Sequence, residues 1–110
     1  MSSTLSALLA QGYIEATSVS QTEVFEAATL FARTEGTLPA PESAHAIKAA
    51  INEALRCKRE GKSENIVFGL TGTGYFDMFA YGRYNDGKME DYVPTDEEIA
   101  KGLAGLPDIA

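Results

Sequence analysis

Cysteine, histidine and tryptophan are almost absent from this chain. Its 110 residues include one cysteine, Cys57, one histidine, His45, and no tryptophan. A lone cysteine excludes an intrachain disulfide and a thiolate metal cluster, and a lone histidine excludes a metal site built from several imidazoles. The sparse use of cysteine favours a reducing, cytoplasmic setting.

Long apolar runs are missing as well. No stretch approaches the roughly 18 consecutive apolar residues that indicate a membrane-spanning helix. Residues 1–4 lack the basic start of a secretory signal peptide. The sequence therefore predicts no membrane partner and no export.

Positive charge is scarce. Lysine and arginine number 9 against 16 aspartates and glutamates, for a formal net charge of −7. Because a negative surface repels phosphate backbones, nucleic acid is a poor candidate partner. Hydrophobic residues make up 45% and charged residues 23%, which is typical of a globular protein. We expect a single domain over residues 1–110.

The spacing of apolar residues predicts five helices. They cover residues 4–11, a stretch from Ser20 to just before Gly36, residues 41–60, 76–84 and 96–103. Ser20 and Glu23 have the spacing of a capping box, and Thr95 opens the last helix in the same way. Residues 93–110 are assigned to a C-terminal helix and tail.

Two segments are typical of strands. Residues 13–19 suit a pleated surface, and the nearly continuous apolar run of residues 65–70 indicates a strand buried on both faces. With helices between them, they predict an α/β fold with a small partial parallel sheet and flanking helices, joined by a right-handed crossover. So thin a sheet has open edges, which favour pairing with further protein.

A glycine turn follows the second predicted strand. Residues 71–74, Thr-Gly-Thr-Gly, let backbone N–H groups approach a ligand, and Thr71 and Thr73 add hydroxyl groups. The carboxyl end of a parallel strand is a common place for a ligand. The alternative is a tight turn that simply requires glycine, since neither a dinucleotide fingerprint nor a phosphate-binding loop is present.

Glu42 and His45 open the third predicted helix. They could act as acid and base on an unknown substrate. Alternatively, Glu42 complements the helix dipole, and His45 is a packed or exposed side chain that acts as neither base nor ligand. A dense aromatic group lies further along the chain and fits either a stacking platform or packing in a core or interface; it comprises Tyr75, Phe76, Phe79, Tyr81 and Tyr84.

Two longer motifs point to a family. Residues 31–46 are FARTEGTLPAPESAHA, and residues 68–77 are FGLTGTGYFD. Together they closely resemble the C-terminal part of the tryptophan synthase beta chain, in the beta-like branch that occurs without the usual alpha partner. The resemblance extends from about Ser6 to Tyr92. It implies a fragment of the type II fold of pyridoxal-phosphate enzymes, and a lyase that replaces the β-hydroxyl of serine with indole.

The resemblance also implies roles for five residues. Thr71 matches the serine or threonine that hydrogen-bonds the pyridine nitrogen of pyridoxal phosphate, and such a neutral partner leaves that nitrogen unprotonated. Gly72 and Gly74 match the turn that carries this residue past the ring. Glu42 matches a carboxylate near the ring, and Ser43 is its neighbour at the same helix start. His45 matches a family histidine without an assigned catalytic role.

The chain departs from the family in two respects. Thr73 and Tyr75 replace residues that are commonly histidine in this branch. The resemblance places the Schiff-base lysine, the phosphate cradle and the catalytic glutamate of the family upstream of the segment seen here. None of the lysines in this chain stands in a context like the Schiff-base motif; they are Lys48, Lys58, Lys62, Lys88 and Lys101. We therefore expect a truncated segment that binds no pyridoxal phosphate and does not catalyse alone. Its expected partner is an N-terminal fragment, and the alternative is a self-assembling homo-oligomer.

Overall fold

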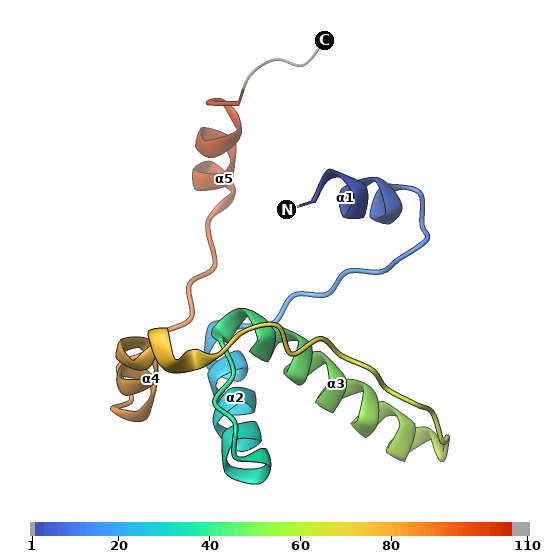
Figure 1. Cartoon of the computed structure of the whole chain (residues 1–110). Coiled ribbons are helices and arrows are strands. Elements are labelled where there is room, and N and C mark those ends of the chain that lie inside the picture. The colour runs from blue at the N-terminus through green and yellow to red at the C-terminus, as the bar shows by residue number, and fades with distance from the viewer. Residues whose placement is uncertain (1, 107–110) are drawn as a thin grey trace.

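The chain folds around two packed helices, α2 and α3, in a computed structural model that describes residues 2–106 (Figure 1). The elements in chain order are α1 (Ser3–Ala10), α2 (Gln21–Glu35), α3 (Pro41–Glu60), the 3-10 turn η1 (Gly74–Phe76), α4 (Met78–Asn85) and α5 (Asp96–Leu103). The five predicted helices are confirmed. The fourth begins two residues later than expected, because η1 occupies the residues before it.

The ends of α2 and α3 follow from local chemistry. The predicted capping box is present: the backbone N–H and the hydroxyl of Ser20 both donate to the Glu23 carboxylate, at 3.4 and 2.9 Å. Gly36 and Gly61 end the two helices in the left-handed region, at φ 73° and 65°, which costs glycine no steric strain.

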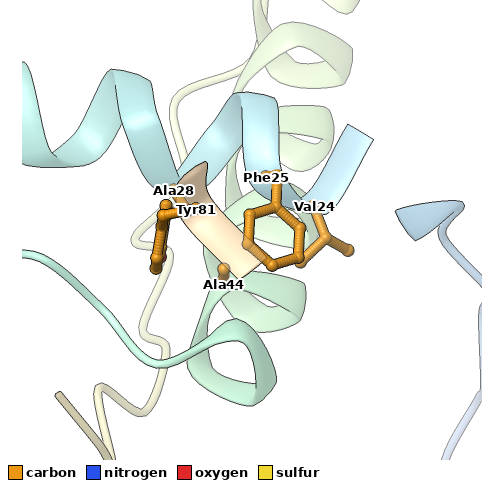
Figure 2. Close-up of a cluster of buried hydrophobic side chains, with 5 residues drawn as sticks. All are labelled: Val24, Phe25, Ala28, Ala44 and Tyr81. Atoms are coloured by element: carbon orange, nitrogen blue, oxygen red, sulfur yellow. The ribbon is translucent and has the colours of Figure 1, made fainter. Parts of the chain in front are cut away.

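The core forms where α2, α3 and α4 meet. Ala28 of α2 and Ala44 of α3 are fully buried, and their small side chains allow the helices to approach closely. Phe25 lies beside Tyr81 of α4, with ring centroids 4.9 Å apart in an edge-to-face arrangement. Figure 2 shows this cluster with Val24 beside it.

The predicted partial parallel sheet is wrong. Within residues 2–106 there is no strand, and the β-type pairing consists of one isolated antiparallel bridge between Pro39 and Thr73. Residues 65–70 are extended, but they run back along α3 (Figure 1) and place Ile66 and Phe68 beside it. An extended segment becomes a strand only when a second one pairs with its backbone, and residues 13–19 do not do so.

The outer helices give the molecule an open shape. Its radius of gyration is 16.9 Å, against about 13 Å for a compact domain of this length. Neither α1 nor α5 contains a buried residue, and Figure 1 shows extended segments that join α1 to α2 and α5 to α4. Many large apolar side chains are therefore exposed. Across residues 2–106, no helix combines the length and apolar character needed to cross a bilayer.

Asp91 ties the segment after α4 to the start of α2. Its carboxylate accepts from the backbone N–H and the hydroxyl of Thr22, at 2.8 and 2.6 Å. Both hydrogen bonds lower the pKa of Asp91 below its ordinary value of 3.8, and the one from the Thr22 side chain has the larger effect.

We predict that Asp91 contributes an acid-sensitive part of the stability. The pKa of Asp91 is lower in the folded than in the unfolded chain, where it is near 3.8. The stabilisation by Asp91 is therefore fully present at a pH above the unfolded-state pKa, and it is lost as the pH falls through the folded-state pKa. The free energy of unfolding, measured with urea between pH 3 and 7, should therefore fall less steeply with acid in Asp91→Asn than in the parent chain. Parallel curves for the two proteins would contradict this.

Candidate functional site

The glycine turn is clamped onto the loop that precedes α3. The N–H of Ala40 donates to the carbonyl of Gly72, and the N–H of Gly74 donates to the carbonyl of Leu38, both at 2.9 Å. These two bonds flank the bridge between Pro39 and Thr73. They bring residues 71–74 to the N-terminus of α3, where Glu42 and Ser43 lie. The clamp joins the two sequence motifs in space.

Ser43 organises the turn through one buried oxygen. The residue is only 2% exposed, and its Oγ accepts the backbone N–H groups of Thr71 and Gly72 at 3.1 and 3.0 Å. The same Oγ lies 3.0 Å from Oγ1 of Thr71. Three of the five residues assigned by resemblance are thus in direct contact, while Thr71 itself remains exposed.

The two glycines of the turn lie close to other chain segments, and the approach is closer at Gly74 than at Gly72. A Cβ on Gly72 would lie 3.0 Å from the Cβ of Ala40. A Cβ on Gly74 would lie 2.5 Å from the carbonyl oxygen of Pro39 and 2.9 Å from the ring of Tyr81. Neither glycine has a positive φ, so the requirement is space between chain segments rather than an unusual backbone angle.

Tyr81 is a supporting residue that sequence reasoning did not single out from the aromatic group. Its hydroxyl donates to the carbonyl of Pro39 at 2.6 Å, on the loop that clamps the turn. Burial, with a smaller effect of the Asp77 charge, raises the pKa of Tyr81 to about 12, so the group remains a donor. The available signal was that a buried tyrosine needs a partner for its hydroxyl.

Glu42 and His45 lie on the exposed side of the same helix start. Glu42 is in the first turn of α3, where the helix dipole favours a carboxylate. Nδ1 of His45 is 2.9 Å from the carbonyl oxygen of Pro41 in its own helix. Over the residues that the structure describes, no group of three or more histidine, cysteine, aspartate or glutamate side chains could hold a metal ion.

An open apolar groove lies on the other part of α3, and we call it the α2/α3 groove. Its volume is about 350 Å³. Phe31 and Phe68 meet at one side of it, with ring centroids 6.1 Å apart. The groove is lined by Leu30, Phe31, Thr34, Ile47, Ala50, Ile51, Ala54, Ile66 and Phe68. The apolar side of α3 is largely uncovered toward its C-terminal end, where Ala54 and Leu55 are exposed.

Comparison with known proteins identifies relatives over most of the chain. No protein-family model matches it. It is 62% identical over 80 residues to tryptophan synthase beta chain 2 of Aquifex aeolicus, covering 73% of this chain and 18% of the relative. It is 54% identical over 99 residues to the tryptophan synthase beta chain of Thermococcus onnurineus, and the match covers 90% of this chain and 22% of that protein.

Beta chain 2 of Pyrococcus furiosus is 50% identical over 104 residues, which cover 94% of this chain and 23% of that protein. The chain thus spans about a fifth of the length of these relatives. Identity at this level across both motifs confirms the resemblance: the chain belongs to the tryptophan synthase beta chain family and corresponds to a C-terminal segment of it.

Proposed function

We propose that this chain supplies the ring side of a pyridoxal-phosphate site in a tryptophan synthase beta-type enzyme. The whole enzyme would replace the β-hydroxyl of serine with indole. The observation that carries the proposal is the contact of the Thr71 hydroxyl, on an exposed residue, with buried Ser43 at the start of α3. The resemblance to the family implies that Thr71 is the partner of the cofactor's ring nitrogen.

The residues present fit that cofactor. Thr71 offers a neutral hydroxyl group, which can donate to an aromatic nitrogen without protonating it. Gly72 and Gly74 allow the turn to lie against the loop before α3, and Glu42 places a carboxylate at the neighbouring helix start. Bound pyridoxal phosphate would supply the electron sink for the replacement reaction. In our proposal Thr71 orients the ring, and Glu42 lies near it.

The remainder of the catalytic apparatus is proposed to come from a second polypeptide segment. No lysine lies within residues 71–74. Three of the five lysines form ion pairs elsewhere: Lys48 with Glu23, Lys62 with Glu60, and Lys88 with Asp86. This supports a chain that is inactive alone and binds no pyridoxal phosphate alone.

The exposed apolar surface supports docking to that second segment. About four fifths of the length of each relative lies outside the region that matches this chain. The α2/α3 groove is open and apolar, and Val67, next to it, is 93% exposed. We propose that the α2/α3 groove receives apolar side chains from the remainder of a beta chain, since exposed apolar patches mark protein contacts.

The experiment is complementation in two pieces. The 110-residue chain is mixed with Aquifex aeolicus beta chain 2 from which the matched segment has been deleted. We expect a stable complex with saturable pyridoxal-phosphate absorbance, and tryptophan formation from serine and indole. The chain alone should show no saturable binding of the cofactor and no activity, because it offers only the ring side.

Controls separate the cofactor site from assembly. Thr71→Ser keeps the hydroxyl and should retain cofactor binding in the complex, whereas Thr71→Val should weaken it about tenfold while leaving the complex intact. A complex that binds no cofactor would contradict the proposed function. Absence of a complex, with self-association of the free chain in sedimentation, would favour the homo-oligomer instead.

A further inference from the structure

The hydrogen bonds of Ser43 determine the direction of a proton. A serine hydroxyl has one hydrogen to donate and two lone pairs that accept. Both lone pairs of the Ser43 Oγ are engaged by the backbone N–H groups of Thr71 and Gly72. The contact of 3.0 Å with Oγ1 of Thr71 therefore uses the Ser43 hydrogen: Ser43 donates and Thr71 accepts.

The opposite direction conflicts with the surroundings of Ser43. If Thr71 donated, three donors would converge on one oxygen that has two lone pairs. The Ser43 hydrogen would then need another acceptor in a place that is only 2% exposed. Among the described residues, the hydrogen bonds of the Ser43 Oγ join it to Thr71 and Gly72, and Oγ1 of Thr71 is the one atom of these that can accept. A buried donor without a partner is costly, so the observed network favours one arrangement.

We propose that Ser43 is a positioning residue that fixes the Thr71 hydroxyl as a hydrogen-bond donor toward the bound group. Thr71 accepts from Ser43, so its own hydrogen is free, and its exposed position makes that hydrogen available to a ligand. The ligand atom that takes this hydrogen must offer a free lone pair. The inference rests on the proposed function, in which this atom is the ring nitrogen of pyridoxal phosphate.

The network itself is tested on the chain without any cofactor. Backbone amide hydrogen exchange is measured by NMR in the parent chain and in Ser43→Ala. We expect the amides of Thr71 and Gly72 to exchange about tenfold faster in the variant, because each loses its acceptor. Amides within α2 should be unchanged. Unchanged exchange at both Thr71 and Gly72 would overturn the inference regardless of what the chain binds.

The direction of the proton is tested in the two-piece complex loaded with pyridoxal phosphate labelled with ¹⁵N at the ring nitrogen. In the parent complex the ¹⁵N chemical shift should be that of an unprotonated ring. Ser43→Ala and Thr71→Val should each move the shift and weaken cofactor binding about tenfold. The double variant should be no worse than Thr71→Val, since Ser43 acts on the ring only through Thr71.

The two single variants and the double variant together distinguish a positioning role of Ser43 from a structural one. A purely structural role for Ser43 would make the two effects add and leave the ¹⁵N shift of Ser43→Ala at the parent value, which overturns the inference while the proposed function stands. A protonated ring nitrogen in the parent complex also overturns the inference alone. A complex that binds no cofactor overturns the proposed function, and the inference with it.

Discussion

Gly74→Ala should destabilise the chain by about 3 kcal/mol, at the upper end of the cost of overpacking a well-filled site. The added Cβ would lie 2.5 Å from the carbonyl oxygen of Pro39 and 2.9 Å from the ring of Tyr81. The first contact is with backbone that is itself bonded to the Tyr81 hydroxyl, so the neighbours have little freedom to move. The measurement is the free energy of unfolding from urea titration.

Gly82→Ala is the matched control. Gly82 lies in α4, the helix that carries Tyr81, and a Cβ there would meet nothing within 4 Å. Alanine at this position should stabilise the chain by about 0.5–1 kcal/mol, because glycine weakens a helix interior. If the two variants had equal stability, the close approach at Gly74 would not be the reason that glycine is needed there.

Ala54→Asp should weaken assembly with the remaining part of the Aquifex aeolicus beta chain about a hundredfold or more, because an unpaired charge enclosed at an apolar interface costs about 3–5 kcal/mol. Ala54 lines the α2/α3 groove and is exposed in the free chain. The free chain should therefore lose only about 0.5 kcal/mol of stability from helix propensity. Isothermal titration of the two pieces measures the effect.

Asn52→Asp provides the comparison for this experiment. It adds the same negative charge two residues away on α3, at an exposed residue that does not line the α2/α3 groove. Affinity should stay within about threefold of the parent, since a solvated surface charge has a small effect. Equal losses in both variants would mean that net charge, and not the groove, governs assembly. Unchanged affinity in Ala54→Asp would place the interface elsewhere.

The helices were predictable because their signals are local. Ser20 and Glu23 are three residues apart, and both halves of their capping box are present in the fold. Gly36 ends α2 where the sequence predicted, and α3 ends before Gly61, after the predicted residue 60. Val24, Phe25 and Ala28 are buried on one side of α2, since a helical repeat places apolar residues with this spacing on one face whatever they pack against.

The sheet could not be decided in the same way. Residues 65–70 have the composition of a strand and are extended, but a strand also requires a paired neighbour, which composition does not specify. Here only Ile66 and Phe68 help to line the α2/α3 groove. All of residues 65–70 are exposed, so the predicted burial on both faces is wrong. The β propensity of this segment therefore correctly predicted an extended backbone, but the sheet inferred from it was wrong.

By itself the sequence determined the helices, their caps and the family, because these depend on neighbouring residues or on whole motifs. Only the tertiary structure showed why the turn at residues 71–74 needs glycine and what Ser43 does. Ser43 and Thr71 are 28 residues apart in the chain, and Gly74 meets Pro39 and Tyr81 from two other segments. Hydrogen-bond direction and steric limits arise from such non-local contacts, which exist only once the chain has folded.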